Sequence, residues 1–253
     1  MRKMLVANWK MFLKKTETIN LAREIVHKVH SAKDLEIVLA PSFLYLAELR
    51  DLAKKYDLAL CGQDLSTEKE GAVTGQISGE MLKECGCQYV LVGHSERRSL
   101  ARETEEMINR KINMAYSAGL IPLLCVGETM AEKQAEQTEQ VLIKQIQTAI
   151  QKVSALPENE LVIAYEPVWA IGSGNYLEVS EIDSMIKIIK RIVSHIYSEK
   201  FFEEKVRILY GGSVNNLLAP GYFAEKRLSG LLVGRASCHA EDFASIASFH
   251  NAN

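Results

Sequence analysis

The sequence contains no long apolar run, no excess of charge and only five prolines, and these absences exclude several classes of protein. No stretch approaches the roughly 18 consecutive apolar residues of a membrane-spanning helix, so we expect no membrane partner. The formal net charge of −2 provides no global attraction to nucleic acid. No Gly-, Ser- or Pro-rich linker, low-complexity tract or internal repeat interrupts the 253 residues. We therefore predict one domain over residues 1–253.

The cysteines are odd in number and do not form a metal-binding pattern. Cys85 and Cys87 are close together, but no second Cys or His pair stands at zinc-site spacing, so we expect no metal site. Reduced thiols that fill a core are typical of the cytoplasm. The apolar run Leu5–Ala7 is too short for the core of a secretory signal. We therefore expect a cytoplasmic location.

Short apolar strands alternate with helical patterns along the whole chain. With 47% hydrophobic and 25% charged residues, the chain can form a large core, and disorder is not indicated. The predicted strands are 5–8, 36–40, 59–62, 89–92, 121–126, 161–165, 207–210 and 230–233. Apolar residues at every third or fourth position predict helices over 16–29, 103–118, 132–153 and 180–198. This alternation implies an α/β fold with a parallel sheet, either a closed barrel or an open doubly wound sheet.

Two short patterns predict where helices begin. Ser180 and Asp183 are three residues apart, as in a capping pair, at the start of the last predicted helix. Ser95 is a plausible cap for a helical turn over residues 95–98, which have the sequence SERR.

The segment 165–174, with the sequence YEPVWAIGSG, combines a carboxylate at a strand end with a flexible loop. Glu166 directly follows the predicted strand 161–165. Pro167 fixes its own backbone φ, whereas the two glycines permit large dihedral changes. This layout is typical of a catalytic base beneath a closing lid, and the alternative is an ordinary loop with a solvated glutamate. The predicted lid consists of Val168, Trp169, Ala170, Ile171, Gly172, Ser173 and Gly174.

Other polar residues also follow predicted strands. Asn8 and Lys10 come after the first strand and His94 after the fourth. Because the carboxyl ends of parallel barrel strands meet at one face, these residues and Glu166 should lie close together. Taken singly, each has an ordinary explanation, such as a surface lysine, a capping histidine or an asparagine in a turn. Their joint placement favours a catalytic site.

Glycine-rich turns after the last two strands indicate a site for a small anion. The segment 211–213, with the sequence GGS, and the residue Gly234 leave backbone N–H groups uncovered by side chains. Such groups form phosphate cradles at helix N-termini. The alternative is a pair of ordinary left-handed turns.

These motifs closely resemble the triosephosphate isomerase family, in the family's order and over nearly the whole chain. The matching segments are LVANWKM at 5–11, GHSERR at 93–98, YEPVWAIGSG at 165–174, YGGSV at 210–214 and LVG at 232–234. The resemblance implies a single (β/α)8 TIM barrel with a parallel eight-stranded core. It implies interconversion of D-glyceraldehyde 3-phosphate and dihydroxyacetone phosphate, in glycolysis and gluconeogenesis, through an enediol(ate). No cofactor is implied.

The resemblance also assigns roles to residues. Glu166 would be the base, and a neutral His94 would polarise the substrate carbonyl, its pKa lowered by a helix N-terminus. Lys10 would supply positive charge, Asn8 a neutral hydrogen bond, and Glu96 a supporting contact. Tyr210 and Ser213 would bond the closed lid. The implied substrate and phosphate ligands are Asn8, Lys10, Gly172, Ser213, Gly234 and Arg235.

The sequence departs from the family's usual pattern at several positions. Arg235 stands where a second glycine is usual, and we expect it to begin a short helix with negative φ. Ser229 replaces an aspartate, so Arg191 loses its expected ion-pair partner. Gly79 replaces a frequent proline. The second lid hinge, residues 175–177, reads NYL and is bulkier than usual.

The segment 63–79 is long for a connection within a compact domain. Its tip, residues 71–76, matches the family's dimer loop. The resemblance therefore implies a homodimer in which Thr74 reaches the partner's site near Asn8 and Lys10. The alternative is a flexible loop in solvent.

Two other functions remain open at this point. A different phosphate-binding barrel enzyme, such as an aldolase or epimerase, would share the anion site, but an aldolase would want a Schiff-base lysine inside the barrel. A barrel without catalytic activity, used for binding, would be expected to lose Glu166, His94 or Lys10, and all three are present.

Overall fold

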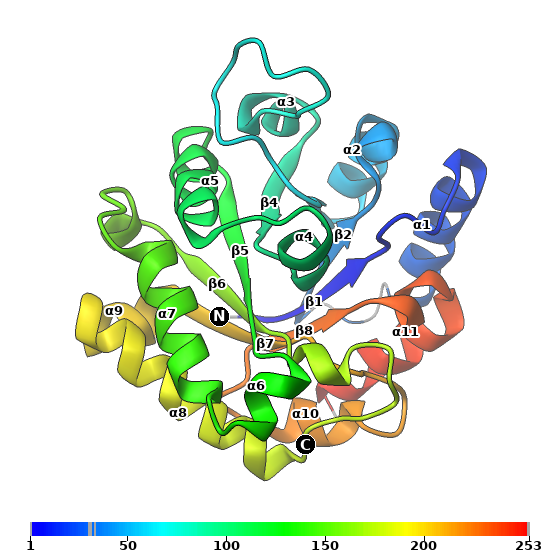
Figure 1. The fold of residues 1–253 in the computed structure, drawn as a ribbon. Coiled ribbons are helices and arrows are strands. Elements are labelled where there is room, and N and C mark those ends of the chain that lie inside the picture. Colours follow the sequence, from blue (N-terminus) through cyan, green and yellow to red (C-terminus); the bar gives the residue numbers. More distant parts are fainter. Residues whose placement is uncertain (1, 30–31, 33, 252–253) are drawn as a thin grey trace.

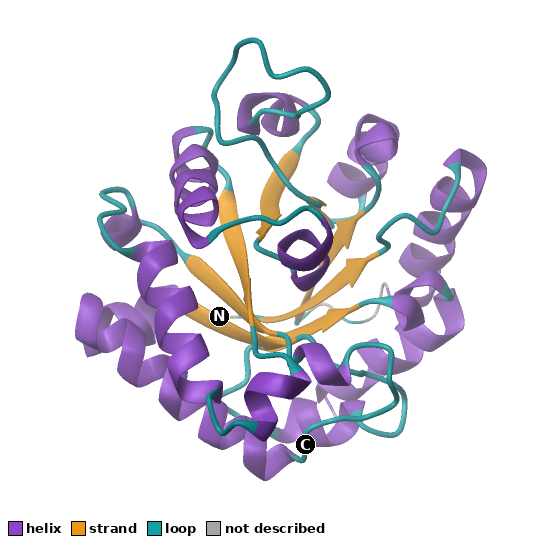
Figure 2. Ribbon diagram, in the orientation of Figure 1, coloured by secondary structure: helices purple, strands orange, loops and turns teal. Residues whose placement is uncertain are grey.

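Parallel strands pair in chain order and close into a barrel, with helices on its outer face (Figures 1 and 2). The computed structural model describes residues 2–29, 32 and 34–251. The strands are β1 (Lys3–Asn8), β2 (Leu35–Ala40), β3 (Ala59–Gly62), β4 (Cys87–Val92), β5 (Ile121–Val126), β6 (Leu161–Tyr165), β7 (Val206–Tyr210) and β8 (Gly230–Val233). The barrel closes because β1 pairs with both β2 and β8. The eight predicted strands and the (β/α)8 barrel are confirmed, and the open sheet is excluded.

The helices follow the strands in alternation, with short 3₁₀ turns between some of them. The helices are α1 (Lys15–Val29), α2 (Leu46–Lys55), α3 (Gly79–Glu84), α4 (Ser95–Leu100), α5 (Glu105–Ser117), α6 (Met130–Gln134), α7 (Thr138–Ile150), α8 (Val179–Ile196), α9 (Glu199–Lys205), α10 (Ala219–Ala224) and α11 (Ala240–Ser248). The 3₁₀ turns are η1 (Phe43–Tyr45), η2 (Leu156–Glu158), η3 (Val168–Ala170), η4 (Arg235–Cys238) and η5 (Phe249–Asn251). None of the helices in the described part of the chain combines the length and apolar character of a membrane span.

One predicted helix is wrong. The segment 132–153 is not continuous, because α6 ends at Gln134 and α7 begins at Thr138. Between them Glu136 adopts a left-handed φ of 56°, which a helix cannot contain. The apolar spacing continues across this break, so the period alone did not reveal it.

Both predicted caps are also wrong. At α8 the capping box joins Glu178 and Glu181, and Ser180 lies inside the helix. At α4 the cap is His94, whose Nδ1 accepts a hydrogen bond from the Glu96 N–H, whereas Ser95 is the first helical residue. In each case the helix starts one or two residues earlier than the hydroxyl side chain suggested.

Alternate residues of each strand face the two sides of the barrel wall. In β1, Met4 and Val6 belong to the core inside the barrel, whereas Leu5 and Ala7 pack against the helices. This alternation follows from the period of two in a strand. Within the described residues, the interior of the barrel is therefore filled with side chains.

Charged groups fill the N-terminal end of the barrel interior. The buried Arg207 forms ion pairs with Glu36 and Glu160, and its Nη2 donates to the Tyr89 hydroxyl at 2.7 Å. The Tyr89 hydroxyl donates in turn to Glu36 at 2.6 Å. Because these groups satisfy one another, this end of the interior is closed.

Ion pairs near β8 differ from those that the family resemblance implies. Arg191 pairs with Glu139 on α7. Just before β8, Arg227 pairs with Asp183 on α8. Arg191 thus makes no ion pair at position 229, where the side chain is the neutral Ser229. Its ion-pair partner is Glu139 on α7.

Candidate active site

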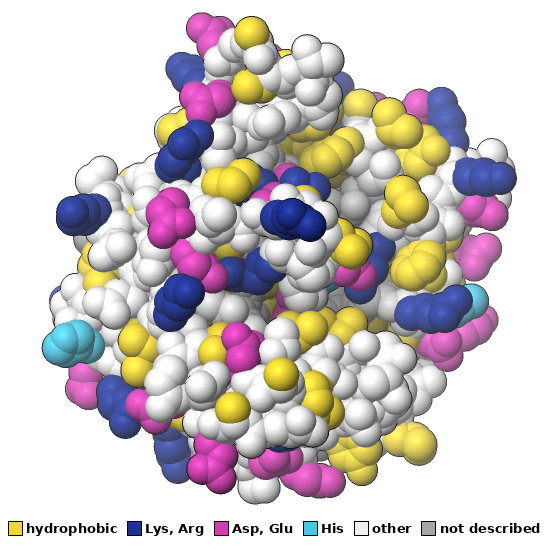
Figure 3. Space-filling view, in the orientation of Figure 1, with side chains coloured by type: hydrophobic (Ala, Val, Ile, Leu, Met, Phe, Trp, Pro, Cys, Tyr) yellow, Lys and Arg dark blue, Asp and Glu magenta, His cyan; other side chains and the backbone are white. Residues whose placement is uncertain are grey.

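Most of the predicted site residues line one cavity at the carboxyl ends of the strands. The cavity has a volume of about 340 Å³, and the centre of this face is hollowed in Figure 3. The predicted residues around it are Asn8, Lys10, His94, Glu96, Glu166, Ile171, Gly172, Ser213, Gly234 and Arg235. The other lid residues lie outside this lining. The barrel thus brings together side chains from both ends of the chain.

Glu166 and His94 form a buried pair at the centre of the site. His94 Nε2 lies 3.2 Å from Glu166 Oε1, and the two residues are only 5% and 3% exposed. Glu166 Oε2 accepts a hydrogen bond from the Ser95 N–H at 3.4 Å. On the far side of the ring, His94 Nδ1 accepts the Glu96 N–H at 3.2 Å. The start of α4 therefore orients both members of the pair.

The two pKa values move in opposite directions. Burial acts to lower the pKa of His94, but the charge and hydrogen bond of Glu166 outweigh it, and the pKa lies above its usual value. Burial acts to raise the pKa of Glu166, but His94, the Ser95 N–H and Lys10 outweigh it, and the pKa lies below its usual value. The Glu166 carboxylate is thus held ionised, and the pKa of His94 is not lowered as the family resemblance implies.

Lys10 is held in a conformation that is rare for a residue with a side chain. Its φ is +49°, and its N–H donates to Asn8 Oδ1 at 3.1 Å. The Gln63 side chain donates to the Lys10 carbonyl at 2.9 Å, and Lys10 Nζ lies 2.6 Å from Glu96 Oε1. Neighbouring contacts thus stabilise a strained turn that directs the ammonium group into the cavity.

Two glycines of the anion site, Gly211 and Gly212, are required by close approaches. A Cβ at Gly211 would lie 2.8 Å from Glu166 Cγ, and one at Gly212 would lie 2.2 Å from the Tyr210 hydroxyl oxygen. Gly234 precedes η4, so its turn leads directly into a helical N-terminus. The Gly211 N–H donates to the Tyr165 carbonyl at 2.8 Å, so the N–H groups open to a small anion come from the residues after Gly211 and from the Gly234 turn.

The expected conformation of Arg235 is confirmed. Arg235 begins η4 and is absent from the non-glycine residues with positive φ. Its side chain is exposed, with the guanidinium carbon 5.7 Å from the centroid of the Phe12 ring. The arginine therefore replaces glycine here without left-handed strain.

The predicted lid begins with η3 and continues through two left-handed glycines. Gly172 has a φ of 66° and Gly174 a φ of 81°, and neither has a neighbour that a Cβ would meet within 4 Å. At the second hinge, Leu177 is buried, and its N–H donates to the Tyr210 hydroxyl at 3.3 Å. Within the described part of the chain, Ser213 makes no hydrogen bond to the lid.

One further residue near the lid was not predicted. Glu128 follows β5, is almost fully buried, and accepts hydrogen bonds from the Tyr165 hydroxyl at 2.9 Å and from Trp169 Nε1 at 2.7 Å. Lys133 Nζ lies 3.4 Å from the centroid of the Trp169 ring. Glu128 and Lys133 therefore fix the position of Trp169 at the first hinge of the lid. Glu128 lies two residues after the predicted strand 121–126, and this position is the signal that could have found it.

Comparisons with known proteins agree with this geometry. A model of the family described as "Triosephosphate isomerase" matches residues 3–250. A triosephosphate isomerase from Dictyoglomus turgidum is 40% identical, with 96% of this chain and 97% of that protein covered. One from Caldanaerobacter subterraneus is 41% identical, with 98% and 99% covered. The crystal structure of triosephosphate isomerase from Bartonella henselae has a TM-score of 0.88 at 30% identity, with 99% of each chain covered. The chain belongs to the triosephosphate isomerase family.

Proposed function

We propose that this chain, as one domain over residues 1–253, interconverts D-glyceraldehyde 3-phosphate and dihydroxyacetone phosphate through an enediol(ate). The observation that carries the proposal is the buried contact of 3.2 Å between Glu166 and His94 at the floor of the cavity. A carboxylate base beside an imidazole suits proton transfer between two carbons that flank a carbonyl. Neither group needs a cofactor for this reaction.

Glu166 removes the proton from one carbon and returns it to the neighbouring carbon. Its carboxylate is already ionised and almost dry, and closing the lid removes the remaining water, which raises its basicity. To reach the substrate, the carboxylate gives up its contacts with His94 and the Ser95 N–H.

His94 donates its Nε2 hydrogen to the carbonyl oxygen and shuttles protons between the two substrate oxygens. We infer that the ring is neutral during this step. The Glu96 N–H points at Nδ1, so a second ring proton would have to displace that hydrogen bond. The carboxylate that raises the pKa of His94 also turns toward the substrate during the reaction.

Positive charge and backbone N–H groups complete the site. Lys10 faces the developing oxyanion, Asn8 donates a neutral hydrogen bond to the same region, and Glu96 positions the ammonium group. The substrate phosphate binds to the backbone N–H groups of Ser213, Gly234 and Arg235, and to that of Gly172 when the lid closes. Each donor lines the same cavity.

A homodimer built on the loop around Thr74 supports the site, and we propose a cytoplasmic location. The loop projects beyond the helices at the top of Figure 1, with Thr74 exposed. Large apolar side chains are exposed on nearby elements, including Met11 at 94%, Leu44 at 79% and Met81 at 53%. Burial of such side chains against a second copy would stabilise the assembly.

The test is an assay of purified protein with each triose phosphate in D₂O. We expect rapid interconversion, with deuterium incorporated at the carbon next to the carbonyl and no added metal or nicotinamide. An aldolase would instead be trapped covalently through Lys10 by borohydride in the presence of substrate. Absence of both reactions would leave only a binding role for the barrel and refute the proposal.

A further inference from the structure

A cavity of about 490 Å³ lies at the end of the barrel opposite the active site. Its walls come from the start of β1, from α8 and α9, and from the segments that lead into β7 and β8. One acidic residue, Glu203, lines it. The cations that line it are Arg2, Lys3, Lys187, Lys190, Lys226 and Arg227.

The nearby carboxylates neutralise only part of this charge. Glu203 pairs with Lys190 at 2.5 Å, and Asp183 is shared between Lys187 and Arg227. Glu225 lies 3.4 Å from Arg227 and also attracts Lys3, Asp57 lies 3.2 Å from Arg2, and Glu199 attracts Lys190. Six cations thus face five carboxylates, in a protein whose net formal charge is −2.

Two of the lysines make no ion pair within the described residues. Lys3 Nζ donates to the carbonyl oxygens of Phe223 at 2.5 Å and Glu225 at 3.2 Å, and it is half-buried. Lys226 is exposed at the rim. A half-buried ammonium group with no ion-pair partner is attractive to an anion, because its charge is less screened than on open surface.

Ser229 adds no charge to the cavity wall. Its neutral hydroxyl lines the cavity and accepts the Ile208 N–H at 3.2 Å. Because Ser229 follows the lining cations Lys226 and Arg227 closely in the chain, a carboxylate at position 229 would reduce the positive charge of the cavity.

The floor of the cavity is apolar. Phe202, Val206, Ile208 and Leu228 are buried and line it. A volume of this size, an apolar floor and convergent charges are features of small-molecule sites. A ligand that suits both the floor and the rim carries an organic group and more than one negative charge.

We propose that this cavity binds a small organic polyanion that carries phosphate groups, at a site separate from the active site. The lysines act as point charges for the phosphate oxygens, and the apolar floor receives the organic part. Because the cations come from α8, β1 and the segment before β8, a bound ligand links elements that are far apart in the sequence.

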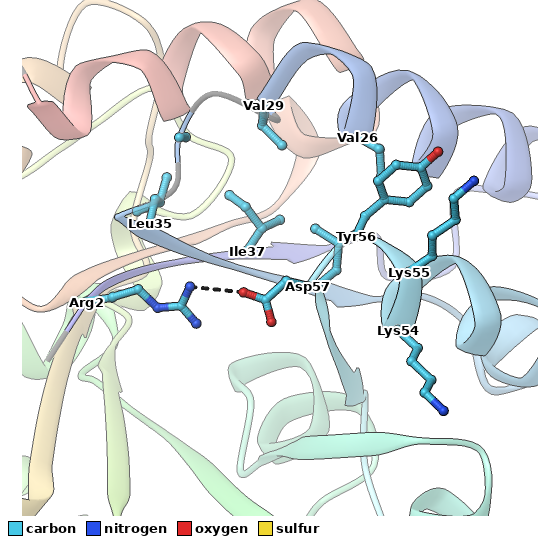
Figure 4. A pocket seen from close by; sticks show the side chains of 11 residues that line it. Arg2, Val26, Val29, Leu35, Ile37, Lys54, Lys55, Tyr56 and Asp57 are labelled. Atoms are coloured by element: carbon cyan, nitrogen blue, oxygen red, sulfur yellow. Dashed lines mark hydrogen bonds and ion pairs between the residues drawn. The ribbon is translucent and has the colours of Figure 1, made fainter.

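The neighbouring cavity provides a comparison at the same end of the barrel. It has a volume of about 500 Å³ and lies between α1, β2 and α2. Figure 4 shows Arg2 turned toward Asp57 there, while the Lys54 side chain extends away from the apolar Leu35 and Ile37. The charged side chains of this second cavity therefore do not converge on its apolar wall. Lys54→Gln removes one lysine there and is the matched control for Lys226→Gln.

The test uses pyrophosphate as the probe, titrated calorimetrically against the wild-type protein, Ser229→Asp and Ser229→Asn. Asp and Asn have the same size, so they separate charge from volume. We expect the wild type to bind pyrophosphate at two classes of site. The dissociation constant of the first class should equal the constant for inhibition of isomerase activity, and the second class should be the proposed cavity. Ser229→Asp should weaken the second class at least tenfold, and Ser229→Asn should retain it. Lys226→Gln should weaken it several-fold, and Lys54→Gln should not.

Activity and melting temperature serve as controls, because none of these residues lies in the active site. Binding in the second class should also weaken as salt is added. Identical binding by the wild type and Ser229→Asp would overturn the proposal, as would a wild type in which every bound pyrophosphate competes with substrate. The comparison of wild type with Ser229→Asp is made by calorimetry alone, so its outcome is independent of the isomerase assay.

Discussion

At the scale of the residue, the position of the Glu166 carboxylate is the first requirement of the proposed chemistry. Glu166→Asp keeps the charge but withdraws the carboxylate by about one C–C bond. A misplacement of this size costs on the order of a hundredfold in rate, so we expect kcat to fall by about that factor with little change in melting temperature. The exposed Glu204→Asp is the matched control. Near-normal turnover in Glu166→Asp would remove Glu166 from the role of base.

The pair of Glu166 and His94 predicts a specific change in pH dependence. Burial acts to raise the pKa of Glu166, but His94 and its neighbours hold it below its usual value of 4.5. The Glu166 carboxylate should therefore stay ionised until the pH passes below this lowered pKa, and any earlier loss of activity in the wild type comes from protonation of His94, whose pKa lies above its usual value, or of the substrate phosphate. In His94→Gln the burial remains and the favourable partner is gone, so the acid limb of kcat/KM that Glu166 sets should move to higher pH.

Profiles of log kcat/KM against pH for both proteins check this expectation. The substrate phosphate titrates near pH 6 in both assays, so the difference between the profiles isolates the enzyme group. His195→Gln, at an exposed position on α8, should leave the profile unchanged. An acid limb that stays in place in His94→Gln would show that the pair is not coupled.

Arg235 tests whether the phosphate is held by backbone groups alone. Since Arg235 starts η4 without left-handed strain, Arg235→Gly should leave its N–H in place. The guanidinium lies within about a Debye length of the phosphate site. We therefore expect a modest rise in KM at low ionic strength, which shrinks as salt is added, with kcat nearly unchanged. A loss of kcat at every salt concentration would mean that Arg235 contacts the reacting substrate.

The sequence predicted which residues at strand ends would lie together in the site, but it did not predict the residues that cap the helices. The positions of Asn8, Lys10, His94 and Glu166 follow from strand order alone, because parallel strands in a barrel end on one face. The cap of α4 depends on the orientation of one ring nitrogen, and the sequence pattern favoured the hydroxyl of Ser95 instead.

At the scale of the element, the lid has a protective role that can be tested by shortening it. An enediolate phosphate exposed to water expels its phosphate, and a closed lid excludes that water. Deletion of residues 171–174 should weaken phosphate binding and release inorganic phosphate during turnover. Glu166→Asp, with an intact lid, is the control for slow chemistry and should release none. A shortened enzyme that is slow but leaks no phosphate would contradict the protective role.

Element boundaries show where periodicity stops being informative. The strands and the helices α1, α5 and α8 were predicted to within two residues, because burial of one face imposes their periods. The break between α6 and α7 depends on the backbone angle of Glu136, to which apolar spacing does not respond. The support of the lid by Glu128 was missed because it depends on long-range contacts with Tyr165 and Trp169.

At the scale of the whole molecule, the assembly remains a prediction. Periodicity alone allowed either a closed barrel or an open doubly wound sheet. The resemblance to the family was needed to choose between them. The dimer rests on the projecting loop and on exposed apolar side chains such as Leu44 and Leu100, which are 79% and 82% exposed in the isolated chain. These side chains lie on elements near the carboxyl face, where a partner would also complete the active site.

Thr74→Arg tests this assembly. Thr74 is exposed at the loop tip, so the substitution should not disturb the barrel itself. In an interface it would bury an unpaired charge, which costs on the order of 3 kcal/mol or more, equivalent to a loss of association of over a hundredfold. Light scattering after size exclusion should therefore change from the mass of a dimer to that of a monomer. Gln147→Arg, which adds the same charge to the exposed face of α7, should leave the mass unchanged.

The activity of Thr74→Arg gives the second readout. If the loop completes the partner's site near Asn8 and Lys10, the strained turn of Lys10 loses a neighbour when the subunits separate. The specific activity of the wild type should then fall on dilution below the dissociation constant, and that of Thr74→Arg should already be low at every concentration. Circular dichroism should show the barrel intact. A monomeric Thr74→Arg with full kcat would show that one chain carries a complete active site, and the contribution of the partner's loop would be excluded.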